Sequence, residues 1–116
     1  MTDRPHVQLR PPGDLRALQL YIIELEARQG WDAEGMQTCL LHLGEELGEV
    51  YEAARKLQHA DPAWMDARRA ALGHELVDVL NYVFAIANRA EIDLHEAFIE
   101  KNERNQNRVW PPRGSG

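Results

Sequence analysis

Residues 36–57 carry apolar side chains at alternating steps of four and three, and this repeat limits the fold more than any other feature of the 116-residue chain. Such spacing lays one apolar stripe along an α-helix and is typical of helices that pack lengthwise against each other. It predicts a long helix with a partner beside it. The apolar positions are Met36, Leu40, Leu43, Leu47, Val50, Ala54 and Leu57.

Three other segments have helical periodicity. Their apolar spacing predicts helices over about 14–29, ending at Gly30, over about 62–88, and from about residue 93 into the phrase KNERNQNRVW. No strand-like alternation occurs. We therefore expect an all-α bundle of four main helices over residues 14–110, with the second and third helices antiparallel. We expect a flexible arm over 1–13 and a disordered tail over 111–116.

The composition argues against several classes of partner. Thirteen basic and nineteen acidic residues give a net charge of −6, whereas nucleic-acid binding depends on a basic surface. The single cysteine, Cys39, cannot form an internal disulfide, and no secretory leader opens the sequence. No uninterrupted apolar run approaches the roughly 20 residues of a membrane span. We expect a soluble, cytoplasmic domain with no nucleic-acid or membrane partner.

Two pairs of acidic residues interrupt the apolar stripes of the second and third expected helices. Glu46 and Glu49 lie three residues apart, as do Glu75 and Asp78, so the members of each pair share one helix face. With residues 40 and 76 at heptad position a, the first acid of each pair falls at position g and the second at position c. Both helices are therefore expected to present an acid pair on the same shoulder of the apolar face.

The two acid pairs also lie at similar distances from the expected turn near Ala60. One is roughly 13 residues before the turn and the other roughly 16 after it, so their levels in an antiparallel pair differ by about 5 Å. Four carboxylates in one small volume need a cation, and oxygen ligands suit magnesium. We expect a Mg²⁺ site, with Mn²⁺ able to substitute. Either pair alone would be read as solvated surface acids.

Other kinds of site lack their motifs in this sequence. It contains no Glu-x-x-His di-iron motif, no Cys/His zinc cluster, no EF-hand loop and no glycine-rich phosphate loop. The histidines at 42, 59, 74 and 95 have no ligand-like spacing, and we expect surface or half-buried polar residues there. Gly44 and Gly48 indicate either a close approach by a ligand or partner helix, or a tight helix crossing within the fold.

The last expected helix carries Lys101, Asn105 and Arg108 at steps of four and three, which places them on one face. A cation, an amide and a guanidinium in line suit the binding of a polyphosphate. Basic residues near a helix C-terminus also interact favourably with the helix dipole, which would explain them without a ligand.

These motifs together resemble those of the MazG-like all-α nucleoside triphosphate pyrophosphohydrolases in their single-domain form. The resemblance covers about residues 15–110 and consists of GWD at 30–32, EELGE at 45–49, ELVD at 75–78 and the closing KNERNQNRVW phrase. It implies magnesium-dependent cleavage of a nucleoside triphosphate between the α- and β-phosphates, giving a monophosphate and pyrophosphate, as in the house-cleaning of nucleotide pools.

The resemblance also assigns roles to individual residues. It implies metal ligation by Glu46, Glu49, Glu75 and Asp78, and it makes Glu45 and Glu49 the candidate catalytic acids. Glu45 falls at heptad position f, so a role in orienting or deprotonating the attacking water requires a partner chain to build the other wall. The implied substrate-binding residues are Trp31 and Tyr82 beside the base, Asn81 as a donor, and Lys101, Asn105 and Arg108 at the phosphates.

Several alternatives stay open at this point. The substrate could be a broad set of nucleotides, dUTP or dCTP specifically, or phosphoribosyl-ATP, and a non-enzymatic helical dimerisation module is the competing class. We also expect a homodimer or a dimer of dimers, because the chain carries more apolar residues than one small bundle needs. The residues expected to cover two sides are Ile22, Ile23, Leu40, Leu41, Val83, Phe84 and Ile86.

Overall fold

The computed structural model describes residues 14–109 and 111–112, and within them the chain is all-α, which confirms the predicted fold class. The arm expected over 1–13, Trp110 and residues 113–116 of the tail lie outside the described residues. The elements are α1 (Leu15–Gln29), α2 (Met36–Gln58), the short 3₁₀ helix η1 (Pro62–Trp64), α3 (Met65–Arg89) and α4 (Leu94–Asn107).

The helix ends follow from local capping. The Asp14 carboxylate accepts a hydrogen bond from the Ala17 N–H at 2.8 Å and begins α1. Gly30 ends α1 in the left-handed region with φ 78°, and the Trp31 N–H donates back to the Glu26 carbonyl at 2.9 Å. Glycine adopts this conformation without the steric penalty of a Cβ. The α1–α2 loop, which carries Trp31, therefore starts from a fixed turn.

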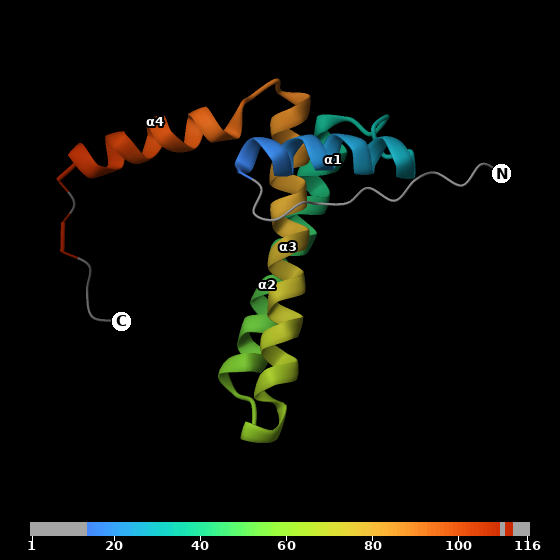
Figure 1. Cartoon of the computed structure of the whole chain (residues 1–116). Coiled ribbons are helices and arrows are strands. Elements are labelled where there is room, and N and C mark those ends of the chain that lie inside the picture. The colour runs from blue at the N-terminus through green and yellow to red at the C-terminus, as the bar shows by residue number, and fades with distance from the viewer. Residues whose placement is uncertain (1–13, 110, 113–116) are drawn as a thin grey trace.

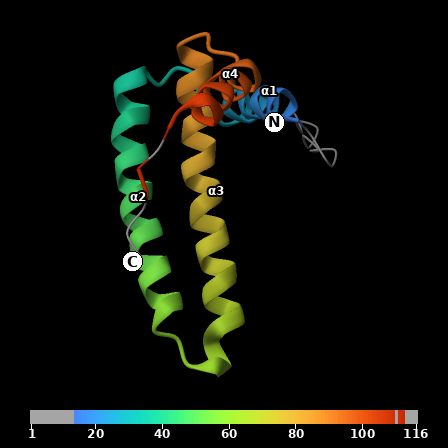
Figure 2. The same cartoon turned by 90° about the vertical axis from the view of Figure 1, so that its left-hand side faces the viewer.

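α2 and α3 form the main contact of the fold. Figures 1 and 2 show them side by side along most of their length, with the chain reversing direction at η1. α1 lies across the end of α3 that is distant from η1 (Figure 1). The small buried core is found there: Ile22 from α1, Cys39 from α2, and Phe84 and Ala85 from α3.

The seam between α2 and α3 is rotated relative to the predicted stripe. Partly or fully buried side chains recur on α2 at 36, 39, 43, 46, 50, 53 and 57, and on α3 at 68, 72, 75, 79, 82 and 86. These are heptad positions d and g. Ala54 and Val83, at position a, are also partly buried, whereas the position-a leucines are exposed, so the prediction that position a packs along the whole seam is wrong. Leu40, Leu47 and Leu76, all at position a, are 50, 44 and 51% exposed.

The physical reason is that the apolar face of each helix is wider than one neighbour can cover. A single antiparallel partner covers a narrow strip. In this chain the strip runs along the g side, where α1 adds further cover over Cys39 and Tyr82. The leucines at position a therefore stay exposed to solvent. Glu46 and Glu75, both at position g, lie in the contact between α2 and α3.

α4 leaves the other helices rather than completing a compact four-helix bundle. It contacts α1, and its later turns lead away from the α2–α3 pair (Figures 1 and 2). The radius of gyration is 17.4 Å, whereas a compact domain of this length has about 13 Å. The bundle expected from the sequence is thus open on one side.

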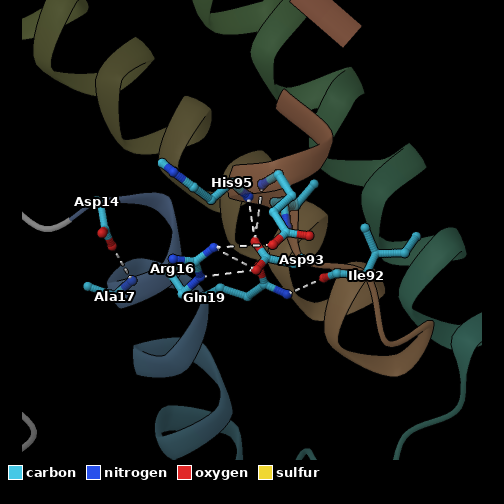
Figure 3. Close-up of polar contacts among 9 residues, drawn as sticks. Asp14, Arg16, Ala17, Gln19, Ile92, Asp93 and His95 are labelled. Carbon is cyan, nitrogen blue, oxygen red and sulfur yellow. Dashed lines mark hydrogen bonds and ion pairs between the residues drawn. The ribbon is translucent and has the colours of Figure 1, made fainter. Parts of the chain in front are cut away.

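A polar joint fixes the direction in which α4 departs. The Gln19 amide of α1 is buried, donates to the Ile92 carbonyl at 2.6 Å and accepts from the Leu94 N–H at 3.1 Å (Figure 3). Beside it, the Arg16 guanidinium pairs with the Asp93 carboxylate at 2.9 Å (Figure 3). Asp93 also caps α4 through the N–H groups of residues 95 and 96. One side chain of α1 therefore holds both sides of the α3–α4 turn.

Replacing Gln19 by leucine should destabilise the protein by about 2 kcal/mol, because two backbone groups of the α3–α4 turn lose their partners. Urea denaturation followed by circular dichroism measures this change. Gln29→Leu, at the exposed end of α1, is the matched control and should change the free energy of unfolding little. Equal stability of the two variants would contradict the role assigned to the joint.

Candidate active site

Three of the four predicted acids converge in the α2–α3 seam. Glu46 comes from α2, and Glu75 and Asp78 come from α3. One carboxylate oxygen from each lies within 4.8 Å of the others. We call these three residues the acid triad. Helical spacing places Glu75 and Asp78 one above the other, and the seam brings Glu46 against them.

The acid triad is electrostatically unfavourable on its own. Burial raises the pKa of the Glu46 carboxyl, and the negative charges of Asp78, Glu75, Glu49 and Glu45 raise it further, in that order. Within the described residues no lysine or arginine forms an ion pair with a member of the triad. Glu46 and Glu75 are partly buried and Asp78 is exposed. Clustered carboxylates without a compensating charge fit the hard oxygen ligand set of a divalent cation such as Mg²⁺.

The fourth predicted metal ligand, Glu49, and the predicted catalytic acid Glu45 lie outside the triad. Glu49 is exposed and lines a shallow hollow of about 110 Å³ together with Glu75. It is not within the 4.8 Å group, although its charge contributes at Glu46. The Glu45 side chain is 72% exposed and lies 3.6 Å from His42 Nδ1, which agrees with its predicted outward position f. Within one chain, Glu45 therefore lies on the outer surface of α2.

A cleft of about 460 Å³ opens beside the triad, between α1, α2, α3 and the α1–α2 loop. Its lining includes Trp31 and Tyr82, predicted to lie beside the base, and Asn81, predicted to donate to the substrate, together with Glu46 and Asp78. The structure thus brings these five predicted residues to one cavity. The rest of the lining consists of Ile22, Leu25, Glu26, Glu34, Cys39, His42 and Ala85.

An aromatic pair forms one wall of the cleft. The His42 and Tyr82 rings stack with centroids 5.5 Å apart. Burial raises the pKa of the Tyr82 phenol, and the charges of Glu46, Glu34 and Asp78 add to the effect. His42 was expected to be a surface or half-buried polar residue, so this wall was not predicted. The signal was available, since Cys39, His42 and Glu46 follow helical spacing along one face of α2.

A buried ion pair closes the end of the cleft near the α1–α2 loop. Arg89 of α3 and Glu26 of α1 pair at 2.5 Å, with side chains only 15 and 10% exposed. The Arg89 guanidinium also donates to the carbonyls of Trp31 at 3.0 Å and Glu34 at 2.7 Å. Sequence reasoning did not find this pair, because its members are 63 residues apart and only the packing of α1 on α3 joins them.

The predicted phosphate-binding residues do not reach the acid triad within one chain. Lys101 and Asn105 lie on α4, and Arg108 directly follows it, so all three are on the segment that leads away from α2 and α3 (Figure 1). Asn105 is partly buried, and its amide donates to Asn102 at 3.4 Å. Lys101 is exposed.

Comparison with known proteins identifies the domain. Residues 34–110, which include the acid triad and α4, match the model of the MazG nucleotide pyrophosphohydrolase domain. Proteins named dCTP pyrophosphatase 1 from Rattus norvegicus and Mus musculus are 38 and 37% identical over 108 residues, covering 88% of this chain and 62% of each relative. The Homo sapiens protein of that name is 34% identical over 99 residues. The chain thus spans about three fifths of the length of the rodent relatives.

Glu46→Gln should raise the melting temperature of the metal-free protein by about 2–5 °C, because it removes the charge that burial and four neighbouring acids disfavour. Added Mg²⁺ is expected to raise the melting temperature of the wild type, and this increase should be mostly lost in the variant. Thermal melts with and without Mg²⁺ measure both effects. Glu24→Gln, on the exposed face of α1, is the control and should behave as the wild type. A lower melting temperature for metal-free Glu46→Gln would contradict the electrostatic account.

Proposed function

The chain belongs to the MazG nucleotide pyrophosphohydrolase domain family, and on this premise we propose that it is a magnesium-dependent nucleoside triphosphate pyrophosphohydrolase. It would cleave the bond between the α- and β-phosphates and release a nucleoside monophosphate and pyrophosphate. The observation that carries the proposal is the convergence of Glu46, Glu75 and Asp78 at one end of a cleft walled by aromatic side chains. Such a cleft suits a flat base at one end and charged phosphates at the other.

The acids would act by fixing cations against the triphosphate. Glu46, Glu75 and Asp78 form the ligand set in the seam, and Glu49 would join it from the adjoining turn of α2. When bound, Mg²⁺ neutralises phosphate charge and lowers the pKa of a coordinated water. Glu45 or Glu49 would orient that water or take its proton. Trp31 and Tyr82 would flank the base, and Asn81 would donate a hydrogen bond to the substrate.

The proposed substrate class is a deoxynucleoside triphosphate of the dCTP type, in the house-cleaning of nucleotide pools. The relatives named dCTP pyrophosphatase 1 support this choice over phosphoribosyl-ATP, and dUTP is the alternative that an assay must separate. A substrate drawn from the free nucleotide pool fits the cytoplasmic location expected from the sequence. The competing class, a non-enzymatic helical module, leaves the acid triad and the cleft without a role.

We further propose that the active unit is a homodimer or a dimer of dimers. The face of α2 and α3 formed by heptad positions a and e is apolar and exposed: it holds Leu40, Leu47 and Tyr51 on α2, and Leu76 and Leu80 on α3. The expected second apolar face is present elsewhere too, since Ile23 and Leu41 are 47 and 66% exposed. Monomers rarely leave so much contiguous apolar surface in water.

The glycines of these helices support an approach from outside the chain. A Cβ added at Gly44, Gly48 or Gly73 would meet nothing within 4 Å, so a tight crossing within the fold, one of the two predictions for Gly44 and Gly48, is wrong. Gly44 and Gly73 fall at heptad position e, beside the exposed leucines. The absence of a side chain there would let a helix of a second copy approach closely.

The apolar surface of α3 is extensive enough to require an explanation. By length and composition alone, Pro62–Arg89 could cross a membrane, with an 18-residue window of mean hydropathy 1.3 that is 17% buried. The acids of residues 70–88 are Glu75 and Asp78, and a bilayer would penalise both. A protein partner would cover the exposed apolar face of α3, and a cation would neutralise Glu75 and Asp78, so these two explain the composition of the helix better than a bilayer does.

The first test is a panel of common and deoxy nucleoside triphosphates incubated with Mg²⁺, with the products separated by chromatography. The wild type should form monophosphate and pyrophosphate, and Asp78→Asn should reduce kcat by at least about 100-fold because it removes one carboxylate of the triad. Asp66→Asn, a fully exposed acid on the same helix, should keep wild-type activity. Orthophosphate as product would indicate a different bond, and no product from any nucleotide would favour the helical module.

The second test asks whether α4 acts on the site of a neighbouring chain. Asp78→Asn and Lys101→Ala should each be nearly inactive alone, since one lacks the metal site and the other the phosphate contact. After co-refolding, one site of each mixed dimer is intact, and random pairing restores about a quarter of the wild-type activity. Light scattering measures the oligomeric state in parallel. No recovery on mixing, or full activity from a monomer, would contradict the shared site.

A further inference from the structure

Glu34 is a polar group of the cleft that the proposed reaction leaves without a task. It lies in the α1–α2 loop, lines the cleft with Trp31 and Tyr82, and is partly buried. No residue in the described part of the chain donates a hydrogen bond to its carboxylate or pairs with it. A partly buried carboxylate gains from a hydrogen-bond donor. Trp31 and Tyr82 line the same cleft of about 460 Å³, so a flat ligand bound against them could supply this donor.

Arg89 donates a hydrogen bond to the backbone carbonyl of Glu34 and has no N–H left for the Glu34 carboxylate. A guanidinium has five N–H donors, and all five of Arg89 are used. Two bind the Glu26 carboxylate at 3.1 and 2.5 Å, and three bind the carbonyls of Ala85 at 3.0 Å, Trp31 at 3.0 Å and Glu34 at 2.7 Å. The loop is therefore fixed in place, while the Glu34 side chain is left for a ligand.

Glu34 also lies at the end of the cleft away from the acid triad. Glu34 precedes α2, whereas Glu46 lies ten residues beyond the first residue of that helix, about 15 Å along its axis. Arg89, which holds the Glu34 carbonyl, is likewise eleven residues from Asp78 on α3, roughly 16 Å along the helix. A nucleotide with its phosphates at the triad would thus place its base towards Glu34.

We propose that the Glu34 carboxylate accepts a hydrogen bond from an exocyclic amino group of the substrate's base, and that Arg89 is the positioning residue that holds Glu34 for this contact. This inference rests on the proposed function. The amino group of cytosine is a donor at the position where uracil carries a carbonyl acceptor. A carboxylate facing that carbonyl would pair two acceptors, so the site should reject uracil and favour cytosine.

The test compares dCTP with dUTP, which differ at this group. The ratio of kcat/KM for dCTP over dUTP should exceed about tenfold in the wild type, as expected for one hydrogen bond to a charged group. In Glu34→Gln it should fall to within about threefold, mainly through KM, because an amide can also donate to the uracil carbonyl. Glu24→Gln, an exposed acid of α1, should keep the wild-type ratio. An unchanged ratio in Glu34→Gln, or no preference in the wild type, would overturn the inference.

Two further measurements separate this inference from the proposed function. Arg89→Lys keeps a charge for Glu26 but supplies fewer donors to the loop, so its ratio of dCTP to dUTP should also fall. Calorimetric titration with dCMP and dUMP needs no turnover. Tighter binding of dCMP by the wild type, lost in Glu34→Gln, supports the inference even if no triphosphate is hydrolysed and the proposed function fails. Equal binding of dCMP and dUMP by the wild type would overturn it while leaving hydrolysis intact.

Discussion

Two carboxylates of like charge, Glu46 and Glu75, lie in the packing seam between the two longest helices, and the rest of the molecule is arranged around that constraint. Apolar side chains at position a were available for the seam, and the chain leaves Leu40, Leu47 and Leu76 outside instead. The fold thus gives up apolar burial in one chain in order to hold acids where water is partly excluded. Fixed charges interact more strongly there than in bulk water.

The cleft has two ends with different charge balance. At the triad, three acids lack a positive partner, and burial makes ionisation of Glu46 unfavourable. At the loop end, the Glu26 carboxylate is neutralised by Arg89, whereas no residue in the described part of the chain donates to the Glu34 carboxylate. Hydrogen bonding to Glu26 raises the pKa of Arg89, so this cation stays charged at every physiological pH. A ligand that spans the cleft would therefore bind best with positive charge at the triad end and a neutral hydrogen-bond donor at the loop end.

Local chemistry made much of the fold predictable from the sequence. Asp14, Gly30 and Asp93 set helix ends through caps that involve only near neighbours, and the helix bounds agree with the expected ones. The acid triad was also within reach, because helical spacing and equal depth from the turn are properties of sequence. What periodicity does not determine is which edge of a wide apolar face meets the neighbour. The rotation of the seam therefore appears only in three dimensions.

The direction of α4 and the loop end of the cleft depend on contacts between distant residues. Gln19 joins α1 to the α3–α4 turn, and Arg89 joins α3 to the α1–α2 loop. Neither residue belongs to a motif, and each is placed by the crossing of α1 over α3. Glu34 was overlooked for the same reason, since Tyr82, its aromatic neighbour in the cleft lining, comes from α3.

The way Arg89 holds the α1–α2 loop has a consequence for how this domain could diversify. Its contacts to that loop are to the main-chain carbonyls of Trp31 and Glu34, and every amino acid has such a carbonyl. Side chains in the loop can therefore be exchanged without loosening the support beneath them. The residues that fix the loop and the residue that contacts the base are therefore different. A new base preference can arise by one substitution at position 34, while the helices and the acid triad stay unchanged.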